Sequence, residues 1–479
     1  MQSNTQRAKK KPTFIQGLFP LVFMILSLII GYGYFKLRAE PLLILSTFIS
    51  GIIAIKLGYT WNDMQDAIIE KISKTMPSIL VLWSVGFLIG SWMFSGTVPM
   101  IIYYGIQIAN PKFFLVSSFI ITAIVSTVTG SSWGSVGTIG VALIGIASGL
   151  GINLSAAAGA IIAGSYFGDK ISPLSDTTNL APIVSGSNLY EHIRHMLYTT
   201  IPATIVSIIV YLIAGFNNTN TNISSEKVDM LLTQLDAIFN WNILLFLPAI
   251  LVLYGSIRKW PAIPTMLIAS FFSIILGMIF QGFSLKDGFI SMVKGFSISM
   301  TSYSGEVSDD IIKLINRGGV SSVTETTVLI FSAMGFAGIV TTTGMLDVVL
   351  ETILKKVKST AGIICSTIIS CITMAIATGS SYLTIIIPGE LFKDVYIKNY
   401  LHPKNLSRTL EDSGTVIVPL IPWAAAAAYM SSTLGVATLD YLPWTVFNYI
   451  GIIFAIIFSF TGIGITKLTE EEKNILEKN

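Results

Sequence analysis

Charged residues are scarce in this chain, and their scarcity excludes most soluble architectures. Of its 479 residues only 11% are Asp, Glu, Lys or Arg, whereas 52% are apolar; an average soluble protein carries about 25% charged residues. The net charge is only +3, and the basic residues are scattered through connecting segments instead of forming a basic stripe. We therefore expect the lipid bilayer to surround the protein, and we expect no nucleic-acid partner.

Cysteine, histidine and common enzyme motifs are also few or missing. The two cysteines, Cys365 and Cys371, lie in one apolar run, where a free thiol usually packs as a small hydrophobe. The three histidines, His192, His195 and His402, fall in predicted connections between spans, so we expect them to be solvated or at most to sense pH. The sequence has no His-Glu-x-x-His motif and no glycine-rich phosphate loop. We therefore expect neither an enzyme nor a cofactor.

Long apolar runs stand where charge is missing. A spanning helix needs about 20 mostly apolar residues, and the first run, which follows basic residues, is too long for a signal-peptide core, so we expect it to remain as a first span. The clear candidates are 14–35, 41–57, 77–95, 196–214, 241–257, 262–280, 324–341 and 441–465. Two more runs, 112–150 and 360–398, are interrupted by polar tetrads, which we interpret as tips of re-entrant hairpins. This pattern predicts an all-α polytopic membrane protein with about ten transmembrane helices.

The distribution of basic residues predicts the orientation. If each hairpin returns to its own side, both termini share one face of the membrane. Placing that face in the cytoplasm leaves most of the 29 Lys and Arg residues on the cytoplasmic side, in agreement with the positive-inside rule. We expect a multi-pass protein of the plasma membrane.

The two halves carry the same landmarks in the same order. These are GYTWND (58–63) and GFSLKD (282–287), Gly-Phe at 86–87 and 335–336, Thr-Gly-Ser-Ser at 129–132 and 378–381, and Asn-Leu-Ser at 153–155 and 405–407. Each unit contains an odd number of predicted crossings, so the second copy should be inverted. The predicted units are a cytoplasmic tail (1–13), a first repeat (14–215), an extracellular linker (216–240), a second repeat (241–466) and a second tail (467–479). Inverted repeats with interrupted helices are typical of transporters, although a duplicated scaffold is an alternative.

The two tetrads are the first candidate site. Irregular backbone survives at membrane depth only where it is buried in protein or lines a wet cavity. Glycine permits unusual dihedral angles, and hydroxyl and carbonyl oxygens are hard ligands that suit a small cation. The alternative is that these small residues only mediate helix packing. The residues are Thr129, Gly130, Ser131, Ser132, Thr378, Gly379, Ser380 and Ser381.

A second candidate site lies in two helices that we expect to be broken, at 153–182 and 406–430. Pro173 interrupts the first between Asp169 and Asp176, and charges at this depth must face protein or water. Asp169 either pairs with the adjacent lysine or binds an ion; Asp176 has no adjacent cation, and a buried acid of this kind can hold a proton or a cation. The candidates in this break are Asp169, Ser172, Ser175, Asp176, Thr177 and Asn179.

The second broken helix carries the acids Glu411 and Asp412, with Arg408 three and four residues before them. Because that spacing allows an ion pair on the helix surface, we expect one acid to be paired and one to form the site. The candidates are Glu411, Asp412, Ser413 and Thr415. Over both breaks the proton-carrier candidates are Asp176, Asp169 and Glu411, with Glu390 as a further alternative, and the predicted Na⁺ ligands are Ser131, Ser132 and Asp176.

Three sequence stretches resemble the signatures of the NhaC-type Na⁺/H⁺ antiporter family, in the ion-transporter superfamily that includes malate/lactate antiporters. They are GSYFGDKISPLSDTTNLAP (164–182), SRTLEDSGTVIVPLIPW (407–423) and TGSSWGSVGTIG (129–140). The resemblance, which runs from about 14 to 465, implies inverted repeats with two hairpins and two broken helices, an elevator-type mechanism and often a homodimer. It also implies Na⁺/H⁺ exchange. Coupled exchange of small organic acids, for which Lys170 is the only intramembrane cation, and an amino-acid carrier remain alternatives.

Overall fold

The computed structural model describes residues 9–217, 225–355 and 359–476. Every regular element longer than an isolated bridge in these ranges is a helix, so the predicted all-α fold is confirmed. Eight helices are long and apolar enough to cross a membrane, or up to eleven if each of three bent helix pairs forms one span. The predicted number of about ten falls within that range.

The first half contains ten α-helices. They are α1 (Phe14–Ser27), α2 (Ala39–Lys56), α3 (Trp61–Ser95), α4 (Thr97–Ile108), α5 (Phe114–Thr129), α6 (Ser132–Ser135), α7 (Val141–Gly149), α8 (Leu154–Ile171), α9 (Asp176–Ser185) and α10 (Leu189–Asn217). The longest, α3, starts at a capping box in which Thr60 Oγ1 accepts from Asp63 N at 3.2 Å and the Asp63 carboxylate accepts from Thr60 N at 2.7 Å. The same device starts α1 at Thr13.

The second half contains the remaining α-helices. They are α11 (Ser225–Ile238), α12 (Leu247–Ile257), α13 (Ala262–Leu276), α14 (Leu285–Lys294), α15 (Asp309–Ile315), α16 (Thr324–Thr342), α17 (Met345–Lys355), α18 (Thr360–Thr378), α19 (Ser381–Lys398), α20 (Pro403–Leu410), α21 (Ala425–Leu434), α22 (Thr438–Tyr441), α23 (Val446–Thr461) and α24 (Glu470–Leu476). A π-helical segment, Glu411–Thr415, continues α20. Such segments are frequent at functional sites.

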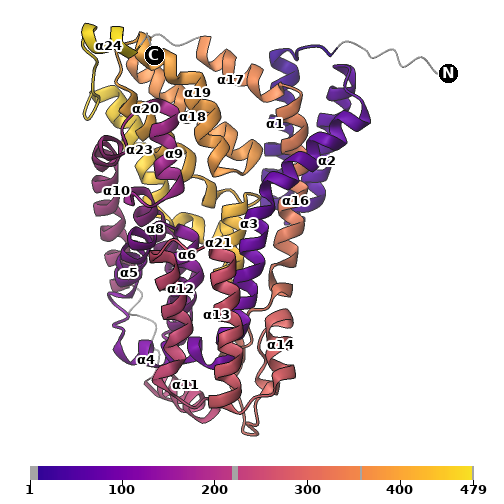
Figure 1. The fold of residues 1–479 in the computed structure, drawn as a ribbon, viewed down its shortest axis with the longest axis vertical. Coiled ribbons are helices and arrows are strands. Elements are labelled where there is room, and N and C mark those ends of the chain that lie inside the picture. The colour runs from indigo at the N-terminus through magenta and orange to yellow at the C-terminus, as the bar shows by residue number, and fades with distance from the viewer. Residues whose placement is uncertain (1–8, 218–224, 356–358, 477–479) are drawn as a thin grey trace, which may run out of the picture.

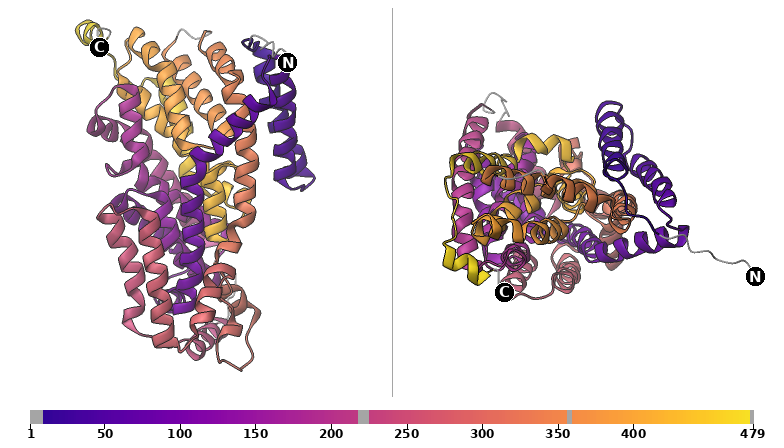
Figure 2. Two further views of the ribbon diagram at one scale, coloured as in Figure 1. Left: turned by 45° about the vertical axis from the view of Figure 1, so that its right-hand side comes forward. Right: turned by 90° about the horizontal axis from the view of Figure 1, so that it is seen from above.

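The molecule is elongated, and both termini lie at the same end of it (Figure 1, Figure 2). Helices α17 to α19 lie in the half of the molecule that holds the termini, whereas α4, α11 and α14 lie at the opposite end (Figure 1). Helix α5 of the first hairpin packs closely against α8 at two glycines of α8. A Cβ atom on Gly164 would lie 2.2 Å from Phe119 O, and one on Gly168 would lie 2.3 Å from Ala123 O, so only glycine fits there. This close backbone approach, common between membrane helices, fixes the first tip relative to the first broken helix.

The two tetrads form matching turns. Helices α5 and α18 end at Thr129 and Thr378, and each is followed by a left-handed glycine, with φ of +67° at Gly130 and +60° at Gly379. The next serine then caps the returning helix. The ends of α5 and α18 are 249 residues apart, as are the starts of α9 and α21. The local folds of the halves therefore correspond along the chain, while the inversion of one half relative to the other stays a prediction.

The prediction that the histidines are solvated is wrong for two of them. His192 and His195 are buried in α10, where His192 Nδ1 lies 2.9 Å from Ser407 Oγ and His195 Nε2 lies 3.1 Å from Asn405 Oδ1. The reason is that the connection between α9 and α10 is only three residues long. The first turns of α10 therefore pack directly against α20 and do not form a loop. His402 is half-buried and caps α20.

Candidate functional site

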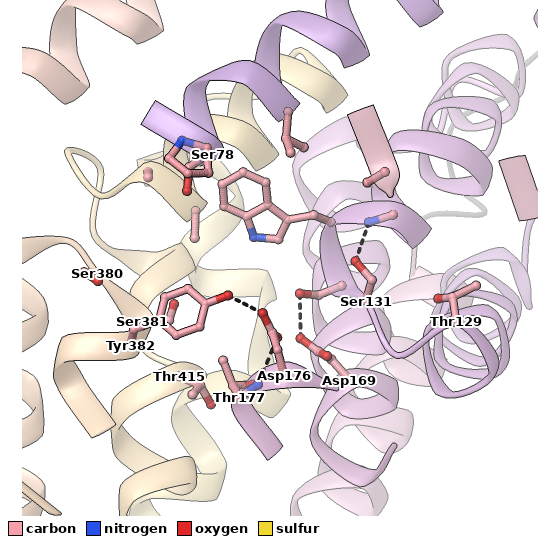
Figure 3. A pocket seen from close by; sticks show the side chains of 18 of the residues that line it. Ser78, Thr129, Ser131, Asp169, Asp176, Thr177, Ser380, Ser381, Tyr382 and Thr415 are labelled. Carbon is pink, nitrogen blue, oxygen red and sulfur yellow. Dashed lines mark hydrogen bonds between the residues drawn. The ribbon is translucent and has the colours of Figure 1, made fainter. Parts of the chain in front are cut away.

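A cavity of about 700 Å³ collects both tetrads and both broken helices (Figure 3). The predicted site residues that line it are Thr129, Ser131, Ser132, Asp169, Asp176, Thr177, Thr378, Gly379, Ser380, Ser381 and Thr415. The other predicted site residues are not part of the lining; they are Gly130, Ser172, Ser175, Asn179, Glu411, Asp412 and Ser413. Helices α3, α12, α13, α16 and α21 supply further wall residues, among them Lys74 of α3, and the connection between α12 and α13 supplies Lys259 and Trp260. Residues from both halves of the sequence thus line one cavity.

The break between α8 and α9 is held by side chains that bind the freed backbone groups. Ser172 Oγ donates to Thr127 O at 2.7 Å, which ties the break to the first hairpin. Thr178 Oγ1 donates to Asp169 O at 3.0 Å, and Asn179 Nδ2 donates to Pro173 O at 2.9 Å. The expected break at Pro173 is therefore present. Within it Ser172 and Asn179 satisfy carbonyl oxygens that would otherwise be unpaired at membrane depth.

Asp169 faces the first hairpin tip and not the adjacent lysine. Its Oδ2 atom accepts a hydrogen bond from Ser132 Oγ at 2.8 Å. Its Oδ1 atom is buried and has no hydrogen-bond partner within the described chain. Buried polar atoms nearly always have a partner, so this oxygen is a candidate ligand for a group that the chain itself does not supply.

Asp176 is exposed at the cavity surface, which corrects the expectation that it is buried without a partner. Ser175 caps α9, so Asp176 occupies the first helical position, and it lines the cavity. Its Oδ1 atom accepts from Thr177 N at 2.9 Å, and its Oδ2 atom accepts from the Tyr382 hydroxyl (Figure 3). The sequence analysis missed Tyr382. The signal was an aromatic residue directly after each tetrad, Trp133 and Tyr382.

In the second broken helix Asp412, and not Glu411, lies next to the positively charged side chains. It is fully buried and forms an ion pair with Lys170, which is 2% exposed. Thr199 Oγ1 donates to the same carboxylate at 2.9 Å, and Arg408 Nε lies 3.9 Å from its other oxygen. Lys170 therefore pairs across the two halves, whereas the sequence offered only its neighbour Asp169 as a partner.

Glu411 is a buried acid without a cationic partner among the described residues. Its Oε1 atom accepts from Thr177 Oγ1 at 3.3 Å and from Thr415 Oγ1 at 3.1 Å, and both of these threonines line the cavity. Its Oε2 atom has no partner in the described chain. Two hydroxyl groups therefore connect Glu411 to the cavity. Glu390, the further alternative, is exposed on α19 and lies outside the cavity lining.

The predicted Na⁺ ligands Ser131, Ser132 and Asp176 all line the cavity, but their hydrogen bonds differ. Ser131 Oγ accepts from Gly134 N at 3.0 Å as a helix cap. Ser132 contacts Asp169, and Asp176 contacts Tyr382. The geometry therefore groups Ser132 with Asp169, and the original set of three stays a prediction.

Comparisons with known proteins agree over nearly the whole chain. Residues 164–463 match the sequence model described as the Na⁺/H⁺ antiporter family. The chain is 49% identical over 465 residues to a Haemophilus influenzae protein named an uncharacterized Na⁺/H⁺ antiporter, covering 97% of this chain and 99% of the relative. It is 37% identical over 462 residues to the Na⁺/H⁺ antiporter NhaC of Alkalihalophilus pseudofirmus, covering 96% and 98%. It is 36% identical over 456 residues to the malate-2H⁺/Na⁺-lactate antiporter of Bacillus subtilis, covering 94% and 96%.

Proposed function

The chain belongs to the Na⁺/H⁺ antiporter family, and from that premise we propose that it exchanges Na⁺ for H⁺ across the membrane by alternating access. One observation carries the proposal. A single cavity is lined by both hairpin tips, by the carboxylates of Asp169 and Asp176, and by two hydroxyl groups that hydrogen-bond to a third carboxylate, that of Glu411. Hard oxygen ligands of this kind suit a small cation, and carboxylates bind either a cation or a proton. Exchange follows if the binding of one ion disfavours the binding of the other.

Asp169 and Asp176, with Ser132, bind Na⁺ in this proposal. Asp169 supplies its unpartnered Oδ1 atom, and Asp176 supplies a carboxylate that already faces the cavity. Glu411 carries the proton, which reaches the cavity through the hydroxyls of Thr177 and Thr415. When Na⁺ binds between the two aspartates, its positive charge favours the ionised form of Glu411 and the proton leaves; when Na⁺ leaves, Glu411 regains a proton.

Coupled exchange of a small organic acid is the second candidate function. A cavity of about 700 Å³ has room for more than a bare ion, and Lys74 and Lys259 stand in its lining. Two facts weigh against it. Lys170, the expected anchor for an organic anion, is paired with Asp412 away from the cavity, and Lys74 is paired with Glu70. The carboxylates of the first broken helix would also repel an organic anion.

Reconstitution into proteoliposomes that contain a pH-sensitive dye separates these functions. We expect Na⁺ alone to drive proton flux, and Asp169→Asn and Asp176→Asn each to abolish it. Asp394→Asn, at an exposed acid of α19 outside the cavity lining, is the matched control and should retain flux. If Na⁺ moves protons only together with malate or lactate, the organic-acid exchanger is the correct function.

The protein is a multi-pass membrane protein, and we place both of its termini in the cytoplasm. The basic residues Lys9, Lys10 and Lys11 directly precede α1, and the positive-inside rule assigns such residues to the cytoplasmic face. Both termini lie at one end of the molecule, so the C-terminal α24 shares that face. The plasma membrane, across which Na⁺ and H⁺ gradients are maintained, is the expected location.

A further inference from the structure

We propose that Tyr382 is a latch on the ion site: its hydroxyl group competes with Na⁺ for the Asp176 carboxylate. This inference rests on the proposed function. Tyr382 is therefore a positioning residue for the exchange reaction, since it acts through Asp176.

The latch joins parts of the protein that are far apart in sequence. Tyr382 is the second residue of α19, directly after the second hairpin tip, and Asp176 is the first residue of α9. The two residues are 206 positions apart. Figure 3 shows the tyrosine ring reaching toward Asp176 from the side of the cavity opposite the first hairpin. This hydrogen bond joins the residue after the second tip to the first broken helix.

Each oxygen of Asp176 accepts one hydrogen bond in this state. Oδ1 accepts from the backbone N–H of Thr177 at 2.9 Å, and Oδ2 accepts from Tyr382. The Thr177 contact belongs to the first turn of α9 and stays as long as that helix does. The Tyr382 side chain is 48% exposed and can swing away without opening the core. The contact that Na⁺ displaces is therefore the one with Tyr382.

The aromatic residue after the first tip is held differently from Tyr382. Trp133 stands directly after the first tetrad, where Tyr382 stands after the second. Its ring stacks on the fully buried Tyr429, with centroids 4.3 Å apart and an interplanar angle of 23°. The Tyr429 hydroxyl also donates to Trp133 O at 2.7 Å. The aromatic residue after the first tip is therefore stacked in the interior, whereas the one after the second tip is half-exposed and contacts Asp176 through its hydroxyl.

The charges around the latch favour its release by a cation. Asp169 lies close enough to Asp176 for the two carboxylates to repel each other. A Na⁺ ion between the two carboxylates removes that repulsion. The Tyr382 hydroxyl carries no net charge and stabilises the Asp176 carboxylate only by donating one hydrogen bond. Hydrogen bonds to an ionised group are stronger than neutral ones, so breaking this contact reduces the net affinity for Na⁺. Removing the hydroxyl should therefore tighten Na⁺ binding.

Tyr382→Phe tests the latch. Titration calorimetry of the purified protein with NaCl should give a Kd roughly tenfold lower than that of the wild type, equivalent to about 1.4 kcal/mol. In proteoliposomes the KM for Na⁺ should fall with it, while the maximal exchange rate should also fall because Na⁺ leaves more slowly. A residue with only a structural role would lower the rate without tightening Na⁺ binding.

Two further variants make the result specific. Tyr190→Phe, at a ring that is 72% exposed on α10 and lines no part of the cavity, should leave Kd and KM unchanged. In an Asp176→Asn background, adding Tyr382→Phe should change Na⁺ binding no further, because the effect passes through Asp176. An unchanged or weaker Na⁺ affinity in Tyr382→Phe overturns the latch. If the wild type itself neither binds Na⁺ nor exchanges it, the proposed function fails instead.

Discussion

At the scale of single residues, the charges of the two broken helices are divided between holding the protein together and facing the cavity. Lys170 and Asp412 neutralise each other in the interior, with Thr199 as a third partner and the Phe447 ring 5.7 Å from the ammonium group. Asp169 lines the cavity, and its Oδ1 atom has no hydrogen-bond partner in the described chain. Such a buried pair contributes little compared with apolar packing, but breaking it is costly because one charge is left unpaired.

Lys170→Met should destabilise the protein by about 3–5 kcal/mol, since the buried Asp412 carboxylate would keep only the Thr199 hydrogen bond and the distant Arg408 contact. Replacing both partners, as Lys170→Met with Asp412→Leu, should restore most of that loss. The midpoint of thermal unfolding in detergent, followed by tryptophan fluorescence, measures both effects. Lys74→Met is the matched control: it breaks an exposed pair with Glu70, and such pairs contribute about 0–1 kcal/mol. Equal losses for Lys170→Met and Lys74→Met would contradict the structural role of the buried pair.

At the scale of elements, the tips and the break follow from local chemistry. A glycine is required at Gly130 and Gly379 because both have left-handed backbones. The two positions differ in their surroundings. A Cβ atom at Gly130 would stand 2.7 Å from the Leu174 carbonyl carbon, whereas one at Gly379 would stand 3.0 Å from Ala424 Cα. The first tip is thus pressed against the first break, and the second has slightly more room.

Gly130→Ala should therefore reduce exchange more than Gly379→Ala does. Both substitutions carry the left-handed strain of roughly 1–2 kcal/mol, but only at Gly130 must the backbone of the break also shift. Rates of Na⁺-driven proton flux in proteoliposomes, normalised to inserted protein, measure the difference. Gly451→Ala is the control, because a Cβ atom there meets nothing within 4 Å. A larger loss at Gly379 would contradict this ranking.

At the scale of the whole molecule, contacts between the halves are what the sequence could not predict. Apolar runs gave the helical class, and Gly130, Gly379 and Pro173 marked the irregular points, since each effect is local. Tyr382 with Asp176 and Lys170 with Asp412 are 206 and 242 residues apart, and local patterns carry no information about such pairs. The burial of His192 and His195 likewise depends on where α20 packs, which no local signal shows.

Alternating access requires one group of helices to move against another, and the contact between α16 and α21 offers a way to stop that movement. Thr326 Oγ1 and Ser432 Oγ are in hydrogen-bond contact between these helices. Cysteines at the two positions therefore lie within reach of a disulfide. In a background with Cys365→Ala and Cys371→Ala, we expect an oxidant to stop Na⁺/H⁺ exchange in the Thr326→Cys, Ser432→Cys variant and a reductant to restore it.

Each single cysteine variant should exchange at the same rate with and without oxidant, which excludes oxidation elsewhere as the cause of the block. Thiol alkylation followed by mass measurement reports the fraction cross-linked, and flux should fall in proportion to it. The flux falls in proportion to the cross-linked fraction only if α21, the last part of the second broken helix, moves relative to α16 during each transport cycle. Full cross-linking with undiminished flux would mean that α16 and α21 move as one body and that the moving boundary lies elsewhere.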